Sequence, residues 1–547
     1  MLNWIDQKVP VRFIAFFTVV ALWVFSALQL AVGQASLLWV FLLTGLVVVG
    51  VYDLQQKSHA ILRNYPIIGH LRFLLEFVRP ELRQYFIEGD HDAVPFSRSQ
   101  RSLVYARAKG ETDKVPFGTQ VDVHAVGYEW LTHSISPSVI ASHDFRVQVG
   151  GAQCSKPYSI SLFNVSAMSF GALSANAIMA LNLGAKRGGF AHDTGEGSIS
   201  RYHREHGGDL IWEIGSGYFG CRNEDGTFNA ERFKKNALSP QVKMIEIKLS
   251  QGAKPGHGGV LPGPKVTPEI AEARGVPVGV DCVSPAAHSS FSTPTELLQF
   301  VQNLRDMSEG KPVGFKLCIG HPWEWFGIAK AMISTGILPD FIVVDGSEGG
   351  TGAAPLELTD HMGMPMLEGL RLVHNTLVGL NLRQHIRLGA SGKIISGFDV
   401  IRTVALGADW CNSARGFMFA LGCIQAQTCH TGNCPTGVTT QDPKRQIALV
   451  VPNKSERVQN FHRQTLESVQ EMLQATGLMH PADLSLKHIM RRMSDHEVIN
   501  LNSLMLSLAP GVLLTYQDPQ DLQGLFQQYW ADASPDHFQL KAAGAKA

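Results

Sequence analysis

An uninterrupted apolar run lies near the start of the chain. The 40 residues from Phe13 to Tyr52 carry no charged side chain, and a small polar cluster at 33–36 divides them. The run is too long for one membrane span and suits two spans of about 17–20 residues joined by a tight turn. One buried helix of that length would be exceptional in a soluble protein, and a cleaved signal peptide would have a shorter apolar core. The pattern predicts a transmembrane helical hairpin, with helices at about 13–32 and 36–52.

Basic side chains flank the apolar run on both sides. Lys8 and Arg12 precede it, and Lys57 and Arg63 follow it. By the positive-inside rule, both ends of the hairpin face the cytoplasm. We therefore expect a multi-pass protein of the inner (cytoplasmic) membrane, with its catalytic domain facing the reducing cytoplasm.

A different pattern begins at about residue 157. A short apolar strand, a Gly-rich or polar loop and a helical stretch alternate eight times, with candidate strands at 159–168, 189–193, 210–214, 243–249, 312–318, 340–344, 385–388 and 408–411. This alternation is typical of a (β/α)8 TIM barrel, an α/β fold in which the loops after the strands share one face. A doubly wound open sheet is the alternative, because periodicity alone does not show closure. The stretch from Gln251 to Thr293 is then an unusually long loop, of the kind that covers a site.

These patterns divide the 547 residues into regions. They are the transmembrane hairpin (1–59), a polar, proline-broken collar (60–150), the barrel (151–445) and a helical C-terminal region (446–547). The collar is expected to pack the barrel onto the hairpin. In the C-terminal region, 455–477 and 494–508 have amphipathic helical patterns.

Charge and glycine content narrow the function. Lys+Arg and Asp+Glu are both 47, so the formal net charge is zero and nothing indicates a nucleic-acid surface. Many of the 53 glycines gather in loops that follow apolar runs, as in GSEGGTGA and GASG. Ordinary turns explain any one such cluster. Because glycine lets backbone N–H groups approach a phosphate or a planar ring, the series favours a ligand site.

Three of the eight cysteines fall close together. Cys423, Cys429 and Cys434 form a C-x5-C-x4-C pattern followed by proline. Thiolates at these spacings suit an iron–sulfur cluster that lacks one iron corner. Zinc with His430 as a fourth ligand and unliganded core cysteines are the alternatives. The other five are scattered in apolar or turn segments and are expected to be core thiols.

Cationic and hydroxyl side chains follow several of the predicted strands. Ser391-Gly392-Lys393 and the run 412–416, which contains Ser413 and Arg415, come after strands seven and eight, where barrel enzymes commonly bind phosphate. Lys316 lies inside an apolar strand, where it could hold negative charge on a reduced flavin ring. Polar loops and a salt-bridged strand-end lysine are the respective alternatives.

A further cluster follows the fourth strand. Lys248, Gln251 and Lys254 place two cations and an amide within seven residues. Such a set suits a small dianion as substrate. For Lys254, a solvated surface position is the alternative.

Several of these segments match one family together and in order. The motifs are Ser166–Gly171 (SAMSFG), Asp193–Gly197 (DTGEG), Ile247–Gly256 (IKLSQGAKPG), Val283–Pro285 (VSP), Gly349–Ala353 (GGTGA) and the cysteine run Cys429–Val438 (CHTGNCPTGV). Residues 155–445 resemble the flavin-binding synthase domain of glutamate synthase. The whole chain resembles the stand-alone, membrane-anchored glutamate synthase-like family.

The resemblance implies a fold, cofactors and a reaction. It implies a (β/α)8 barrel that holds FMN and a [3Fe–4S] cluster and reduces 2-iminoglutarate, formed from 2-oxoglutarate and ammonia, to L-glutamate. The implied cluster ligands are Cys423, Cys429 and Cys434. The implied FMN-binding residues are Ala167, Met168, Ser169, Lys316, Ser391, Gly392, Lys393, Ser413 and Arg415. Lys316, Lys248 and Gln251 are the implied catalytic residues, and Lys248, Gln251 and Lys254 the implied substrate contacts.

The chain also departs from the family pattern. It begins Met1-Leu2-Asn3, where the large glutamate synthase subunit has the nucleophilic cysteine of a glutaminase domain, so we do not expect glutamine hydrolysis. No G-x-G-x-x-G in a βαβ context indicates NAD(P)H or FAD binding. His257 replaces a glutamate, Ser289 and Ser290 replace a His-Asp pair, and Ser347-Glu348 replaces another. These changes bear on the substrate more than on the cofactors.

The leading hypothesis is an oxidoreductase acting on a CH–NH2 bond. Electrons from an external donor, such as a ferredoxin or a reductase subunit, enter through the cluster and reduce FMN, which delivers a hydride to bound 2-iminoglutarate. A second hypothesis is a membrane-anchored FMN dehydrogenase that oxidises another amino or hydroxy acid and passes electrons to quinone. A third is a non-catalytic redox sensor that kept the cofactors.

Overall fold

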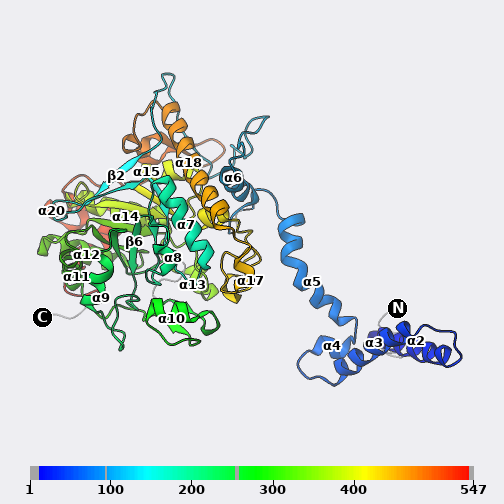
Figure 1. The fold of residues 1–547 in the computed structure, drawn as a ribbon. Helices are drawn as coiled ribbons and strands as arrows, with labels where there is room; N and C mark the ends of the chain where they lie inside the picture. Colours follow the sequence, from blue (N-terminus) through cyan, green and yellow to red (C-terminus); the bar gives the residue numbers. More distant parts are fainter. Residues whose placement is uncertain (1–10, 93–94, 253–257, 541–547) are drawn as a thin grey trace. The chain divides into compact units, whose positions relative to one another are not determined.

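The computed structural model describes residues 11–92, 95–252 and 258–540. The chain forms two compact units, residues 1–92 and 93–547. Figure 1 gives the element labels used below. Each unit is described by itself.

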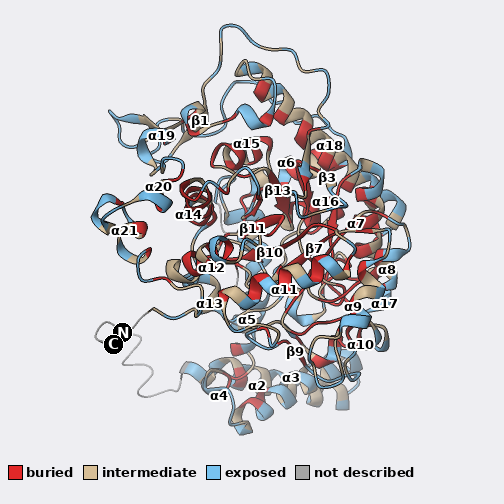
Figure 2. Ribbon diagram, turned by 90° about the vertical axis from the view of Figure 1, so that its left-hand side faces the viewer, coloured by how far each residue is buried: buried red, intermediate tan, exposed pale blue. Residues whose placement is uncertain are grey.

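The N-terminal unit is helical. Its elements are η1 (Val11–Phe13), α2 (Ile14–Ala31), α3 (Leu37–Gln55), α4 (Ala60–Asn64), α5 (Gly69–Leu82) and η2 (Arg83–Ile87). Helices α2 and α3 are long and apolar enough to cross a membrane, and few of their residues are buried (Figure 2). They pack together, and Trp23 Nε1 donates a hydrogen bond to Thr44 Oγ1 across them (2.8 Å).

Eight parallel strands close into a barrel in the second unit. In barrel order they are β4 (Phe163–Val165), β5 (His192–Asp193), β6 (Leu210–Ile214), β7 (Val242–Lys248), β10 (Val313–Leu317), β11 (Phe341–Asp345), β12 (Arg387–Ser391) and β13 (Trp410–Ser413), which pairs with β4. The (β/α)8 prediction is confirmed, and every predicted strand overlaps one of these. The open-sheet alternative is wrong because β13 and β4 share a register that closes the sheet.

Helices follow the strands and surround the barrel (Figure 1). They are α7 (Ala175–Gly188), α8 (Arg201–Arg204), α9 (Ala230–Ala237), α11 (Pro294–Met307), α12 (Pro322–Thr335), α13 (Leu356–His361), α14 (Met366–Gly379), α15 (Gly397–Ala405) and α16 (Arg415–Leu421). Local sequence sets several of their starts. Ser174, Asn229, Thr293 and Ser396 each accept a hydrogen bond from a first-turn N–H of α7, α9, α11 and α15, which stabilises a helix start by about 1 kcal/mol.

A two-stranded hairpin closes the amino end of the barrel. β2 (Arg146–Val149) and β3 (Tyr158–Ser161) pair antiparallel. Val149 and Ile160 from this hairpin pack in one buried cluster with Ile211, Phe341 and Trp410, which lie at the starts of barrel strands. Because this end is filled with apolar side chains, the opposite, carboxyl end of the barrel is the open one.

The long loop after β7 has structure of its own. It contains β8 (Val260–Leu261), η3 (Gly263–Lys265), α10 (Pro268–Arg274) and β9 (Cys282–Val283), and β8 pairs with β9. Arg274 donates a hydrogen bond to the backbone oxygen of Phe170 in the loop after β4 (3.2 Å). The loop therefore reaches across to the far side of the barrel mouth.

Helix α18 (Val451–Ala475) dominates the C-terminal region and packs against α7 and α6 (Arg98–Lys109). Gly184 of α7 permits this approach, since a Cβ there would lie 2.7 Å from Val458 Cβ. Before α18 the chain forms η4 (Cys429–Thr431) and α17 (Pro443–Gln446). After it come η5 (Pro481–Asp483), η6 (Leu486–His488), α20 (Val512–Thr515), η7 (Pro519–Asp521) and α21 (Leu525–Tyr529).

The predicted helix at 494–508 is wrong. That stretch forms β15 (Val498–Asn500) and the single turn α19 (Leu501–Leu504). β15 pairs with β14 (Ile489–Arg492), which pairs in turn with β1 (Glu129–Leu131) in the collar region. Pairing with β14 in a hairpin outweighed the local helical pattern, and β1 extends that hairpin into a three-stranded sheet.

Candidate active site

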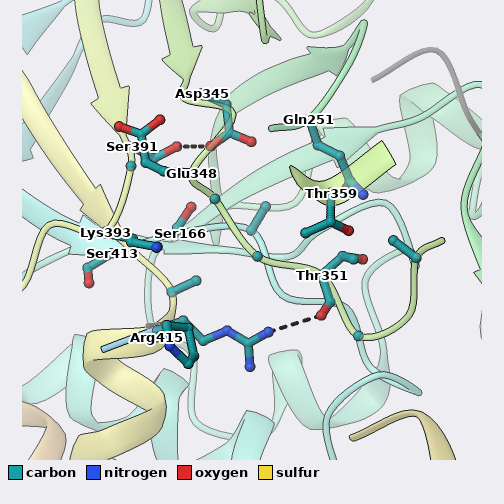
Figure 3. Close-up of a pocket in the computed structure, with 18 of the residues that line it drawn as sticks. Ser166, Gln251, Asp345, Glu348, Thr351, Thr359, Ser391, Lys393, Ser413 and Arg415 are labelled. Carbon is teal, nitrogen blue, oxygen red and sulfur yellow. Dashed lines mark hydrogen bonds between the residues drawn. The ribbon is translucent and has the colours of Figure 1, made fainter. Parts of the chain in front are cut away.

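A cavity of about 1120 Å³ opens at the carboxyl ends of the barrel strands (Figure 3). Its wall includes residues from the carboxyl ends of six of the eight strands or from the loops that follow them. The long segment from Asp345 to Pro355, after β11, supplies much of one side. Barrel enzymes place their chemistry at this face. The cavity is therefore the candidate active site.

Lys316 extends from β10 into a group of three buried carboxylates beneath the cavity. Its ammonium forms ion pairs with Glu213 of β6 and with Glu246 of β7, the latter at 3.2 Å. Asp193 of β5 completes the group: ligand oxygens of the three acids all lie within 4.8 Å of one another. All four side chains are buried, and Lys316 also lines the cavity. The structure thus shows the salt bridge that the alternative expected, and it also places Lys316 on the cavity wall.

The charges in this cluster depend on one another. Burial alone would lower the pKa of Lys316, but Glu213 and Glu246 raise it well above its usual value. Burial raises the pKa of Asp193 to about 7, with Glu213 adding to the rise. Burial also raises the pKa of Glu246 well above its usual value. Near neutral pH the cluster therefore contains a fixed ammonium and fewer than three negative charges. It can hold and release a proton next to the cavity.

The predicted substrate residues occupy different environments in the structure. Gln251 lines the cavity. Lys248 is instead engaged by Glu196, with Nζ 3.1 Å from Oε2, and neither side chain is more than one-fifth exposed. His288 Nε2 lies 2.8 Å from the Lys248 backbone oxygen. Lys254 and His257 lie outside the described residues.

The two predicted phosphate loops come together on one wall. Ser391, Gly392, Lys393, Ser413 and Arg415 all line the cavity. In Figure 3, Lys393 and Ser413 lie on the side opposite Gln251 and Thr359. The Arg415 guanidinium donates a hydrogen bond to the backbone oxygen of Thr351 (3.0 Å). Ser391 Oγ donates to Asp345 Oδ1. Positive charge and hydroxyl groups therefore converge where an anionic group of a cofactor could bind.

Two polar atoms of the cavity wall lack a partner among the described residues. They are Asn412 Oδ1, at the end of β13, and Gln425 Oε1. A buried acceptor without a partner costs about 1–3 kcal/mol. Gly392 is tightly placed as well, since a Cβ there would lie 2.8 Å from Met366 Cβ. Both acceptor atoms are inaccessible to solvent although their residues line the cavity, so a bound group would reach them only after these side chains turn.

The three predicted residues after β4 differ in position. Ala167 lines the cavity together with its neighbour Ser166. Met168 is buried in the main core. Ser169 Oγ accepts a long hydrogen bond from Arg274 in the loop after β7 (3.4 Å). Ala167 alone of the three is thus placed at the cavity wall.

The cysteine loop borders the same cavity. Cys423 and Cys429 line it, and Cys434 is buried beside them. Burial raises the pKa of Cys423 to about 11, and the neighbouring Cys429 and Cys434 add to the rise. Burial would also raise the pKa of Cys434, but hydrogen bonds from Thr439 and Thr436 lower it to about 7. All eight cysteines are free thiols.

Two side chains from distant segments hold this loop in place. Tyr105 Oη of α6 donates to the Cys423 backbone oxygen (2.6 Å). Lys265 Nζ, from the long loop after β7, donates to the Cys429 backbone oxygen (2.6 Å). Lys265 is buried, so a cation lies inside the protein next to the thiols. A buried positive charge next to three thiols fits a metal–sulfur group that carries net negative charge.

The collar region supplies residues that sequence patterns did not identify. Pro95 and Phe96 line the cavity, and Phe96 packs edge-to-face on Phe419 of α16 (5.3 Å between ring centres). Lys393 Nζ lies 5.8 Å from the centre of the Phe96 ring. The available signal was weak: Ser97 and Gln100 form a capping box that marks the start of α6 immediately after these residues.

Of the departures from the family motifs, one pair lies at the site. Ser347 and Glu348 line the cavity, and burial raises the pKa of Glu348. Glu348 Oε2 accepts a hydrogen bond from the backbone N–H of Met366 (2.9 Å). Ser289 and Ser290 border a separate, open pocket of about 630 Å³. Among the departures that fall within the described residues, the Ser347-Glu348 change is therefore the one that bears on the cavity.

A sequence model described as the conserved region in glutamate synthase matches residues 138–479. The chain belongs to the glutamate synthase family. The match includes all eight barrel strands and the three clustered cysteines. Glutamate synthases are oxidoreductases acting on CH–NH2 donors, and this chain is a member of that enzyme class.

Relatives within the family differ in how much of their length the chain covers. The glutamate synthase large subunit-like protein YerD of Bacillus subtilis is 38% identical over 494 residues, which is 83% of this chain and 94% of that protein. The archaeal-type glutamate synthase (NADPH) of Thermotoga neapolitana is 37% identical over 314 residues, 57% of this chain and 59% of that protein. The chain thus spans nearly all of the first relative and little more than half of the second.

Solved structures with a similar arrangement include flavoenzymes. A mutant flavocytochrome b2 with sulfite bound covers 86% of this chain and 95% of its own, at 14% identity and a TM-score of 0.42. A mandelate oxidase mutant with a monooxide FMN adduct covers 77% of this chain and 99% of its own, at 14% identity and a TM-score of 0.38.

Proposed function

We propose that this glutamate synthase family member uses FMN and a [3Fe–4S] cluster to reduce 2-iminoglutarate, formed from 2-oxoglutarate and ammonia, to L-glutamate. One observation carries the proposal. The cationic loops at Lys393 and Arg415, the buried ammonium of Lys316 and the thiols of Cys423 and Cys429 all border one cavity. A phosphate-bearing cofactor, a redox cluster and a reducible substrate would therefore share one site.

The wall residues suit FMN in particular. Lys393 and Arg415 would hold its phosphate. Ser391 and Ser413 donate their hydroxyl hydrogens to Asp345 Oδ1 and to the Ile394 backbone oxygen, so they would have to exchange these partners to bind the phosphate. FMN, when bound, supplies hydride transfer. Lys316 would place its positive charge beside the cofactor, and the acids behind it keep that charge in place.

Cys423, Cys429 and Cys434 would ligate the cluster. The hydrogen bonds to Cys434 and the buried Lys265 both favour the thiolate form that such ligands need. The cluster would pass electrons from an external donor to the cavity. A ferredoxin or a reductase subunit remains the proposed donor.

Substrate binding would use Gln251 and Lys248. The Gln251 amide already faces the cavity and can orient a carboxylate. Lys248 would have to exchange its Glu196 partner for a carboxylate of the substrate, because the ion pair now occupies its Nζ. Lys254 stays a proposed contact. Holding both carboxylates fixes the reacting carbon, and such positioning accelerates hydride transfer strongly.

The N-terminal unit would anchor the enzyme. Helices α2 and α3 are proposed to cross the inner membrane as a hairpin, with the barrel in the cytoplasm. Their exposed apolar side chains, such as Phe25, Leu28 and Phe41, support this assignment. Retention of the full chain in the membrane fraction after carbonate washing is expected, and release by that wash would contradict it.

A second candidate function follows from the same anchor. An enzyme that oxidises an amino or hydroxy acid and passes electrons to quinone gains from a membrane location. Ser347 and Glu348 also give the cavity wall a composition that differs from the family pattern. These two observations favour keeping an FMN dehydrogenase as the alternative. A redox sensor without turnover is the least favoured function, because the buried acids around Lys316 can exchange a proton next to the cavity.

The experiment is an anaerobic purification in detergent, followed by optical and EPR spectra and an assay. We expect bound FMN, the EPR signal of an oxidised three-iron cluster, and glutamate formed from 2-oxoglutarate and ammonia by the chemically reduced protein. Cofactors without glutamate, but with flavin bleaching by another acid, would favour the dehydrogenase. Absence of FMN and of the EPR signal would contradict the cofactor assignment itself.

A further inference from the structure

Helix α5 carries an apolar face that the rest of the described N-terminal unit leaves uncovered. The face consists of apolar residues spaced three or four positions apart, which places them on one side of the helix: Leu71, Leu74, Leu75, Val78 and Leu82. Leu71, Leu74 and Leu75 are each more than half exposed. Gly69 is the residue that the helix buries. An apolar stripe of this length in water is unfavourable and calls for a partner.

Arginine side chains run along one edge of this face. Arg72 and Arg79 are two turns apart, and Arg83 follows one turn later at the C-cap. Arg72 Nε pairs with Glu76 Oε1 at 2.9 Å, but both side chains remain more than half exposed. Arginines in such a row can lie along an apolar surface and keep their guanidinium groups in a polar layer above it. The edge is therefore suited to an anionic layer next to an apolar one.

The start of α5 is fixed to the end of an apolar helix. Asp53, near the C-terminus of α3, is fully buried and accepts hydrogen bonds from the Ile67 N–H (2.9 Å) and from His70 Nε2 (2.9 Å). His70 lies in the first turn of α5. If α3 spans the membrane, these bonds hold the first turn of α5 at the level where the span ends.

We propose that α5 lies in the headgroup layer of the membrane and binds anionic phospholipids, with its leucines in the acyl boundary and Arg72, Arg79 and Arg83 on the phosphates. The inference goes beyond the proposed reaction and rests only on the proposed anchoring by α2 and α3. Interfacial helices bind through buried apolar area together with attraction to anionic lipids. A face that packs on protein has the same need for leucines but none for a row of cations beside them.

The test is hydrogen exchange of the full chain in nanodiscs of phosphatidylcholine alone and of phosphatidylcholine mixed with phosphatidylglycerol. We expect the amides of residues 71–82 to exchange more slowly in the anionic discs. Leu75→Glu should abolish that protection. Leu514→Glu is the matched control, because Leu514 is a leucine of the other unit that is half exposed, like Leu75, and it should leave the protection in place.

The arginines are tested together. Replacing Arg72, Arg79 and Arg83 by glutamine should weaken the lipid-dependent protection by about fivefold per arginine. A control that removes the same charge from exposed positions of the other unit, Lys109, Lys235 and Lys487, should leave it unchanged.

Equal exchange of α5 in both kinds of disc, or no effect of the arginine replacements, would overturn the inference and indicate that the face packs on the rest of the chain. The amides of α2 and α3 report separately on anchoring. If they are protected in discs while α5 is not, only the α5 inference fails. If α2 and α3 also exchange freely, the anchoring proposal fails.

Discussion

Lys265 Nζ donates a hydrogen bond of 2.6 Å to the backbone oxygen of Cys429 and so joins the loop after β7 to the cysteine loop. The same ammonium lies 3.4 Å from the Thr439 backbone oxygen. Because Lys265 is buried, its charge is weakly screened by solvent. One side chain thus links the loop that contains the proposed substrate residues to the proposed cluster ligands.

Replacing Lys265 by methionine should lower the reduction potential of the proposed cluster by tens of millivolts, since a nearby positive charge favours the reduced form. The measurement is a redox titration followed by EPR. Lys444→Met, which removes an exposed lysine ten residues after Cys434, is the control. An unchanged potential in the Lys265 variant, with the cluster intact, would contradict this role.

Replacing Lys316 by methionine should destabilise the barrel. The change leaves Asp193, Glu213 and Glu246 buried without a cation, and breaking a buried ion pair costs about 3–5 kcal/mol. Urea denaturation of the full chain measures it. Adding Glu213→Gln to Lys316→Met should recover part of the loss, because it removes one of the uncompensated charges. A double variant no more stable than the single one would show that the pair is not coupled.

Asp193 should give stability a distinctive pH dependence. Its folded-state pKa of about 7 lies above the value of an unfolded aspartate, so the folded chain binds this proton more tightly. The contribution of this proton is fully present below about pH 4 and is lost as pH rises towards 7. Asp193→Asn should remove this slope. Denaturation midpoints at pH 5, 6, 7 and 8 test it; parallel curves for wild type and variant would refute the assignment.

Replacing Arg415 by methionine should weaken FMN binding. A hydrogen bond to a charged group contributes about 1.5–3 kcal/mol, which corresponds to a loss of about 10- to 100-fold in affinity. Quenching of FMN fluorescence on titration with the apoprotein gives the dissociation constant. Arg232→Met, at an exposed site in α9, is the control. Equal affinities for the two variants would place the phosphate elsewhere on the wall.

Substitutions of Gln251 and Lys248 should change KM for different reasons. Gln251 lines the cavity, so Gln251→Ala is expected to raise KM for the substrate at once. Lys248→Met also releases Glu196 from its ion pair, and the freed carboxylate would repel an anionic substrate. Lys248→Met combined with Glu196→Gln should therefore bind the substrate better than Lys248→Met alone. An identical KM in both would indicate that Lys248 acts only on structure.

Local features of the sequence were enough to predict the alternating strands and helices, whereas the closure of the barrel came from the β13–β4 pairing. Each strand is a short apolar run, and cap residues such as Ser174 and Thr293 mark helix starts within a few residues. The helix predicted at 494–508 was wrong because this segment pairs with β14 in a hairpin, and β14 is itself held by β1 of the collar region, a contact that no local pattern encodes.

The sequence by itself determined the alternation of strands and helices, the apolar hairpin pattern and the spacing of Cys423, Cys429 and Cys434. Only the tertiary structure decided that Lys316 faces three acids from three other strands, that Phe96 lines the cavity, and that Lys265 reaches Cys429. The physical reason is the sequence separation over which each kind of interaction acts. Periodicity and capping act over a few residues, whereas these contacts join positions up to several hundred residues apart and depend on barrel closure and register.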